Sequence, residues 1–326
     1  MRITVLTNVD ADGGERDPVV AQVASALRRG KHTVSVFGSP PDVRKLVTGL
    51  TRRKPDLVFH LVEEFGDNPA GNIAVCGLLD LLGLPYTGCG AGEFYLGQDK
   101  VLAKKLLAFE NVPCPNFAVF TRDKAMETGG NLRMPLFVKP VSMDASIGIG
   151  KRSLVRDAGE LMKQVAAIHA ECDDDALAEE YIEGREFYVA VVGNHEPQAL
   201  PPIEVDFSGL PEGAPRVYDR KAKWEPGSAE HGGVKAVVAD IPDDLRARLH
   251  KVSLDAYRAL RVRDYGRVDL RVADTGDIYV LEVNASCYLE KNDEFAMAAR
   301  EAGIDYPQLI GRIVDIAAER TRLNAR

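Results

Sequence analysis

Apolar residues near the start of the chain form two alternating patterns. Residues 2–9 and 56–61 are short apolar runs of strand length, whereas 18–29 and 74–82 carry apolar residues at helical spacing. Strands that alternate with helices of this length are typical of a parallel sheet covered by helices. The pattern therefore predicts an N-terminal α/β domain, to which we assign residues 1–98.

The pattern changes after residue 98. An amphipathic helix is expected at 99–109, and the short strands that follow surround a single predicted helix at 157–169. This α+β arrangement continues with a helix at 242–260, two strands and a terminal helix. We predict a fold with α/β and α+β parts, in which a central subdomain spans 99–186 and a C-terminal subdomain spans 187–326.

Composition and charge narrow the classes of function. The formal net charge of −8 disfavours nucleic acid, whose phosphates select basic surfaces. An odd number of cysteines, none spaced as C-x-x-C, favours neither a zinc site nor a disulfide framework and fits a reducing compartment. Charges at Arg2 and Asp10 leave no room for a signal-peptide core, and the longest apolar stretch, 73–86, is too short to span a bilayer. We expect a cytoplasmic protein that binds neither nucleic acid nor membrane.

The most informative constellation is a predicted hairpin within residues 266–284. If its turn has two or four residues, counting places Asp269 opposite Glu282 and Arg267 opposite Asn284. Side chains alternate between the faces of a strand, so the four share one face. Two carboxylates with Cβ atoms about 4.5–5.5 Å apart repel each other unless a proton or cation separates them. Oxygen donors of this kind suit Mg²⁺.

An alternative interpretation of the hairpin is a solvent-facing edge with alternating charge. The count places Ile278 and Val280 on the face of Glu282, which makes this strand nearly continuous in apolar character. Such strands are usually covered on both sides, and a covered carboxylate needs a partner. A three-residue turn would change the pairing and weaken the case for a metal site.

Two further segments are compatible with nucleotide binding. Lys139 ends a predicted strand and precedes a loop of small residues, 141–150, whose backbone N–H groups could approach phosphate oxygens. A plain hairpin turn is an equal alternative, and the spacing is not that of a Walker A loop. Residues 179–182 form a strand end that could contact a planar base, or an ordinary strand with a turn. The glycine-rich segment 88–92 lacks the spacing of a dinucleotide-binding loop.

Taken in order along nearly the whole chain, these motifs resemble the ATP-grasp superfamily and, within it, the D-alanine–D-alanine ligase-like branch. The strongest stretch is 265–284, where GRVDLRV and YVLEVN are similar to the metal-binding hairpin of that family. The resemblance implies a three-subdomain ATP-grasp fold that binds ATP. It also implies that Asp269, Glu282 and Asn284 bind one or two Mg²⁺ ions, with Mn²⁺ as an alternative, and that Arg267 stabilises a tetrahedral oxyanion.

The same resemblance implies a set of nucleotide contacts. Lys100 and Lys139 resemble the two lysines that contact phosphates. Lys223, within a predicted long loop at 208–233, resembles the lysine that reaches the γ-phosphate and later the acyl phosphate. The remaining contacts are a phosphate-loop serine, the adenine-binding hinge and a ribose carboxylate, which correspond to Ser146, Glu179, Glu180, Tyr181, Ile182 and Glu186.

The substrate side departs from the family pattern. Glu15 resembles the glutamate that holds the ammonium group of the first substrate. Residues 60–68, however, keep only a histidine and a nearby acidic residue of a family motif, and 287–290 replace the Pro-Gly-Met-Thr stretch. We therefore predict a changed substrate. The candidate substrate contacts are His60, Tyr288, Glu290 and Lys291. A core histidine is an alternative interpretation of His60, which ends an apolar strand.

The resemblance implies an ATP-dependent carboxylate–amine ligase that forms an amide through an acyl phosphate. Its expected partners are a small-molecule carboxylate and a small-molecule amine, with amino acids or peptide-like metabolites other than two D-alanines as substrates, and a homodimer is plausible. Three alternatives stay open: an intramolecular cyclase, a non-catalytic nucleotide-binding protein, and a nicotinamide-dependent oxidoreductase. The complete lysines and metal ligands argue against the second alternative, and the missing dinucleotide fingerprint argues against the third.

Overall fold

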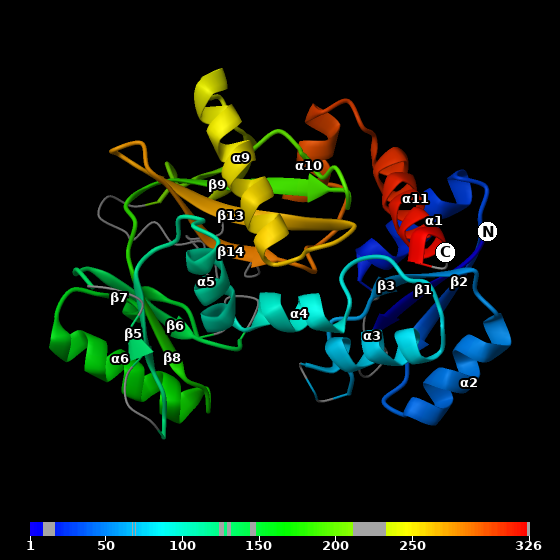
Figure 1. Ribbon diagram of the computed structural model, residues 1–326, viewed down its shortest axis with the longest axis horizontal. Coiled ribbons are helices and arrows are strands. Elements are labelled where there is room, and N and C mark those ends of the chain that lie inside the picture. The colour runs from blue at the N-terminus through cyan, green and yellow to red at the C-terminus, as the bar shows by residue number, and fades with distance from the viewer. Residues whose placement is uncertain are drawn as a thin grey trace.

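The computed structural model of the protein arranges the chain around three sheets, with helices between and outside them (Figure 1). The residues that the structure describes are 1–8, 17–66, 68, 70–123, 127–128, 132–143, 148–210 and 233–324.

The N-terminal sheet is parallel, as the sequence predicts, and its strand order is β2-β1-β3. Its strands and helices are β1 (Arg2–Asn8), α1 (Pro18–Arg29), β2 (Thr33–Ser39), α2 (Val43–Arg53), β3 (Leu57–Leu61) and α3 (Gly71–Leu81). The helix α1 begins where Asp17 accepts a hydrogen bond from the Val19 backbone N–H at 2.9 Å. The helix α2 was not predicted, and its buried residues are only Leu46 and Leu50.

A five-stranded sheet of order β5-β4-β8-β6-β7 is formed by the middle of the chain and lies at one end of the molecule (Figure 1). Two helices precede it, α4 (Ala91–Gln98) and α5 (Lys100–Phe109). The sheet and the helix on its outer face comprise β4 (Phe117–Phe120), β5 (Glu127–Thr128), β6 (Leu136–Pro140), the short 3₁₀ helix η2 (Lys151–Ser153), β7 (Leu154–Val155), α6 (Ala158–Glu171) and β8 (Ala176–Glu180). The helix α5 lies between this sheet and the sheet formed by the C-terminal part of the chain (Figure 1).

The third sheet has the order β12-β11-β9-β13-β14, and β10 pairs with β9. Its strands are β9 (Gly184–Val192), β10 (Gln198–Ala199), β11 (Ile203–Asp206), β12 (Lys235–Val238), β13 (Tyr265–Ala273) and β14 (Ile278–Asn284). The helix α9 (Asp243–Ala259) covers one face and α10 (Glu294–Glu301) covers the other, while α11 (Tyr306–Asn324) packs against α1.

The N-terminal sheet and the third sheet share their hydrophobic cores. One core joins Leu6 and Val58 to Phe187 and Val268, and a second joins the residues of α1 to those of α10 and α11. The five-stranded sheet has small cores of its own under α6 and beside α5. The five-stranded sheet and the hairpin of β13 and β14 therefore belong to parts of the chain with separate cores.

The glycine-rich segment 88–92 joins the N-terminal part to the third sheet. The Gly88 N–H donates to Oδ2 of Asp264 at 2.8 Å, and Nε of Arg263 donates to the Gly88 carbonyl at 3.0 Å. Asp264 is completely buried and also accepts hydrogen bonds from Nε and Nη2 of Arg320, both at 3.0 Å. This segment is a structural junction, which agrees with its lack of a dinucleotide fingerprint.

We expect Asp264→Asn to lower the free energy of unfolding, measured by urea denaturation, by about 3 kcal/mol, because it leaves Arg320 without its buried carboxylate. Asparagine tolerates the positive φ of 65° at this position, so the backbone is preserved. The control is Asp255→Asn, which removes an exposed ion pair with Lys251 and should change the free energy by less than about 0.5 kcal/mol. Equal effects of the two substitutions would contradict the role of the junction.

Candidate active site

The hairpin of β13 and β14 pairs its polar residues as the sequence predicts. Asp269 is opposite Glu282, and Arg267 is opposite Asn284. The turn, however, does not have the two or four residues that this pairing was expected to require. The turn has three residues, 274–276, because the Ala273 N–H donates to the Asp277 carbonyl at 2.9 Å.

A β-bulge restores the pairing that the three-residue turn would have shifted. Leu270 pairs with Val280, whereas Asp269 pairs with Glu282, so the register shifts by one residue on β14 between these two pairs. The bulge also changes which side chains share a face. Ile278, Val280 and Val283 all lie in the core under α9, so the expectation that Ile278 and Val280 share the face of Glu282 was wrong.

The carboxylate of Asp269 is held by a bidentate ion pair. Nε and Nη2 of Arg267 donate to its two oxygens at 2.8 and 3.0 Å, and the Asn284 amide donates to Oδ2 at 3.1 Å. Nη1 of Arg267 lies 3.5 Å from Oε2 of Glu294, and the guanidinium lies 4.3 Å from the ring centre of Tyr188. Burial opposes the charge of Arg267, but Asp269 and Glu294 outweigh it and raise its pKa well above the ordinary value.

The carboxylate opposite Asp269 is held from another element. Nζ of Lys100 lies 3.7 Å from Oε1 of Glu282 and donates to the Met143 carbonyl at 2.8 Å. The position of Lys100 follows from the sequence, because Asp99 caps α5 by accepting from the backbone N–H groups of residues 101 and 102. The first residue of α5 is thereby placed beside the hairpin.

The third group of charged residues is a buried cluster. The sequence predicted Lys139 and Glu179 as site residues but not Lys104. Nζ of Lys139 lies 2.8 Å from Oε2 of Glu179, and Nζ of Lys104 pairs with the other oxygen, Oε1. Burial alone would raise the pKa of Glu179, but the two ammonium groups outweigh it and lower this pKa. Burial would lower the pKa of Lys139, but the carboxylates of Glu179, Glu282 and Asp269 outweigh it and raise this pKa. The four-residue spacing of Lys100 and Lys104 on α5 is the signal that was missed.

The strand end predicted to contact a base is fixed by Arg271, a second residue that the sequence analysis missed. Nη1 of Arg271 donates to the Ile182 carbonyl at 2.8 Å, and Nε and Nη2 donate to Oε2 of Glu186 at 3.1 and 2.8 Å. Arg271 is directly opposite Glu186 in the sheet. Its alternation with Arg267 and Asp269 on β13 could have identified it.

The remaining hinge residues contact the segment before β6. The Tyr181 N–H donates to the Pro135 carbonyl at 3.0 Å, and its ring centre lies 4.9 Å from the Arg271 guanidinium. Oε1 of Glu180 accepts from the Arg133 N–H at 2.9 Å, and Oε2 accepts from the Asn116 amide at 3.3 Å. The side chain of Glu180 therefore points to the connection between α5 and β4.

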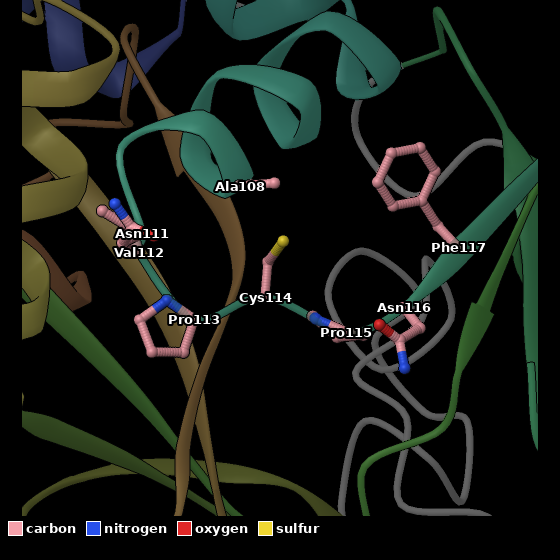
Figure 2. Close-up of a pocket in the computed structure, with 8 residues that line it drawn as sticks. All are labelled: Ala108, Asn111, Val112, Pro113, Cys114, Pro115, Asn116 and Phe117. Carbon is pink, nitrogen blue, oxygen red and sulfur yellow. The ribbon is translucent and has the colours of Figure 1, made fainter. Parts of the chain in front are cut away.

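That connection forms a pocket with a volume of about 280 Å³ (Figure 2). The residues that line it run from the end of α5 to the start of β4 and include no charged side chain: Ala108, Asn111, Val112, Pro113, Cys114, Pro115, Asn116 and Phe117. A triphosphate requires cationic partners, which the lining of this pocket does not provide.

Three of the four predicted substrate contacts meet the start of α1. The Tyr288 hydroxyl donates to Oδ1 of Asp17 at 2.7 Å, and Oε1 of Glu290 accepts from the Gln22 amide at 2.6 Å. The Lys291 N–H donates to Oε1 of Gln22 at 2.9 Å. The loop that follows Asn284 is thus joined to the part of the chain that directly follows residues 9–16. The predicted site residues Glu15, Ser146 and Lys223 lie outside the described residues.

The fourth predicted contact, His60, lies in the hydrophobic core at the end of β3. It is 4% exposed, and its Nε2 lies 3.7 Å from Sγ of Cys76. Its ring is next to those of Tyr86 and Phe94, with centres 6.3 and 6.0 Å away. Burial lowers the pKa of His60 to about 4. This position favours the alternative interpretation of a core histidine.

The hairpin residues fit a hard divalent cation as part of a larger coordination set. Within the described ranges, no group of three or more histidine, cysteine or acidic side chains has the arrangement of a metal site. The protein would offer two carboxylates and the amide oxygen of Asn284, and oxygen atoms from a bound phosphate could complete the coordination. Arg267 and Lys100 now provide the positive charge beside Asp269 and Glu282.

Comparison with known proteins identifies the family. The family model for the D-ala D-ala ligase C-terminus matches residues 106–315 of this chain. The chain belongs to the D-alanine–D-alanine ligase family. The D-alanine–D-alanine ligase of Gloeobacter violaceus is 35% identical over 324 residues, which cover 97% of this chain and 99% of that protein. The enzyme of the same name from Moorella thermoacetica is 33% identical over 286 residues, which cover 85% of this chain and 86% of that protein.

Solved structures show the same fold. A D-alanine–D-alanine ligase from Bacillus anthracis, in complex with ATP, matches with a TM-score of 0.75 and 24% identity over 99% of each chain. The predicted ATP-grasp fold and the prediction of an ADP-forming ligase are therefore confirmed. Membership in a family of ligases argues against the oxidoreductase and against a non-catalytic protein. Within the described residues, none of the helices has the length and apolar character needed to cross a bilayer.

The position of His60 predicts a pH dependence of stability. Its pKa of about 4 in the folded protein is below the ordinary value of 6.5, so the unfolded chain binds the proton first as the pH falls. The contribution of neutral His60 is complete above pH 6.5 and is lost as the pH falls toward 4. Relative to His60→Gln, the wild type should lose about 3 kcal/mol of unfolding free energy over this range.

Urea denaturation at a series of pH values measures this difference. The control is His195→Gln at an exposed position, which should follow the wild type at every pH. If the curves of the wild type and His60→Gln remain parallel between pH 6.5 and 4, the histidine is not buried in its neutral form.

Proposed function

We propose that this ligase uses ATP to activate a small-molecule carboxylate as an acyl phosphate and joins it to an amine. The proposed substrates are amino acids or small peptide-like metabolites other than two D-alanines. The observation that supports the chemistry best is the polar face of β13 and β14. Asp269 and Glu282 are directly opposite each other there, with Arg267 and Lys100 beside them.

In the first proposed step, an oxygen of the substrate carboxylate attacks the γ-phosphorus of ATP, and ADP leaves. Charge spreads over the phosphoryl oxygens, where positioned cations stabilise the transition state. Lys100, Lys139 and Lys223 are proposed to provide this positive charge. Asp269, Glu282 and Asn284 would hold one or two Mg²⁺ ions, or Mn²⁺, which supply further positive charge at the phosphate oxygens.

In the second proposed step, the amine nitrogen attacks the acyl carbon. A C–N bond forms, inorganic phosphate leaves with the electrons of the C–O bond, and the nitrogen loses a proton. Arg267 would stabilise the negative oxygen of the tetrahedral intermediate. Its planar guanidinium is held by Asp269 and Glu294 and lies over Tyr188, so its orientation is fixed before the substrates bind.

The changed substrate is supported by the loop that follows Asn284. Residues 287–290 differ from the stretch expected in the family, and Tyr288 and Glu290 of this loop contact Asp17 and Gln22 of the N-terminal part. Glu294, which follows the same loop, is 6% exposed and adds a carboxylate beside Arg267. Glu15 is proposed to hold the ammonium group of the first substrate.

The test is a screen of amino acids, amines and small dipeptides for ADP release, with mass spectrometry of the products. We expect ADP release to require one carboxylate and one amine and to yield a product lighter than their sum by one water. D-alanine alone should release little ADP. Efficient conversion of D-alanine to its dipeptide would contradict the changed substrate, and ADP release that no carboxylate stimulates would contradict the ligase chemistry.

Removing either opposed carboxylate should reduce turnover. We expect Asp269→Asn and Glu282→Gln each to lower the rate of ADP release by about a hundredfold or more, because each weakens charge compensation at the transferred phosphoryl group. The control is Asp277→Asn in the exposed turn of the same hairpin, which should stay within about threefold of the wild type. Wild-type rates in both site variants would overturn the assignment of these residues to the metal.

A further inference from the structure

We propose that Lys104 is a positioning residue that keeps Lys139 available for the nucleotide phosphates by sharing the carboxylate of Glu179. The inference rests on the proposed function in one respect, because Lys139 is taken to contact ATP. Lys104 lies on α5, Lys139 on β6 and Glu179 on β8, so the cluster joins three elements.

The geometry of the cluster is a carboxylate between two ammonium groups. One oxygen of Glu179 contacts Lys139 at 2.8 Å, and the other oxygen contacts Lys104. The exposed fractions are 2% for Lys104, 4% for Glu179 and 7% for Lys139. Within the described part of the chain, Glu179 is the only carboxylate within ion-pair distance of either ammonium group.

The charges of the cluster do not balance. Two ammonium groups and one carboxylate leave a formal charge of +1 in a site with little access to water, and a buried charge of this kind is costly without a counter-ion. The more distant carboxylates of Glu282 and Asp269 also act on Lys139, on the side that faces the hairpin. An anion bound between Lys139 and the hairpin would balance the excess, and a polyphosphate has this chemistry.

Lys104 supplies the excess positive charge of the cluster. Without it, Lys139 and Glu179 would form a neutral one-to-one pair, and the attraction of Lys139 for a phosphate would be largely offset. Lys104 occupies one oxygen of Glu179 and supplies the second positive charge. Lys104 lies one helical turn after Lys100 on α5, so both lysines are on the same face of the helix. Lys100 lies near the hairpin, and Lys104 belongs to the cluster.

The experiment compares the binding of ATP and of adenosine by titration calorimetry, with adenosine measured by competition where its affinity is low. We expect Lys104→Met to weaken ATP binding by about ten- to a hundredfold, which corresponds to the loss of one charged contact. Adenosine carries no phosphate, so its affinity should change by less than about twofold. The KM for ATP should rise more than kcat falls.

Two further variants serve as controls. Lys105→Met removes the exposed neighbouring lysine and should bind ATP like the wild type. Lys104→Arg keeps the charge and should bind ATP within about threefold of the wild type. If Lys104→Met does not fold, Lys104→Arg alone tests the proposal. A loss of ATP affinity in Lys104→Arg, with its adenosine affinity unchanged, would overturn the proposal.

The remaining outcomes are also decisive. Wild-type ATP affinity in Lys104→Met, or an equal loss of ATP and adenosine affinity, would overturn the proposal. Calorimetry with ATP needs no acyl substrate, so the result is independent of the ligase activity. A wild-type protein that binds ATP but releases no ADP with any carboxylate would contradict the proposed function and leave this comparison valid.

Discussion

The opposition of two carboxylates across β13 and β14 is the constraint around which the site is arranged. Asp269 and Glu282 face each other, and each is held by a cation from a different part of the chain: Arg267 from the hairpin and Lys100 from α5. Close negative charges of this kind favour a cation between them. The same demand supports the divalent ion that is proposed to bind between them.

The pairing of this hairpin could be predicted from the sequence, but only because two irregularities compensate each other. Counting from a turn of two or four residues placed Asp269 opposite Glu282. The turn has three residues instead, and a bulge beside Leu281 restores the same pairing. A bulge has no residue signature here, so the alternation assigned Ile278 and Val280 to the wrong face. The parallel α/β start was predictable because hydrophobic periodicity follows from local backbone geometry.

Contacts between distant segments could not be predicted from the sequence. The spacing of Lys100 and Lys104 on α5 places both on one helix face, yet nothing in the chain near Lys104 indicates Glu179, which is 75 positions away. The same holds for Arg271, whose partner Glu186 lies on another strand. Such pairs depend on the order of strands in a sheet, which residue patterns do not specify, whereas a helix cap such as Asp99 is a local feature of the chain.

The proposed nucleotide contacts and the proposed substrate contacts lie on different segments of the chain, so the two sets of residues can vary independently. The cations proposed to contact the nucleotide and the substrate lie on α5, the five-stranded sheet and the hairpin, where ion pairs fix each of them in place. The predicted substrate contacts lie instead on the loop after Asn284 and at the start of α1, joined by Tyr288 to Asp17 and by Glu290 to Gln22. Substitutions in that loop leave the ion pairs of Lys100 and Lys139 unchanged, which is why we propose a changed substrate together with retained ATP chemistry.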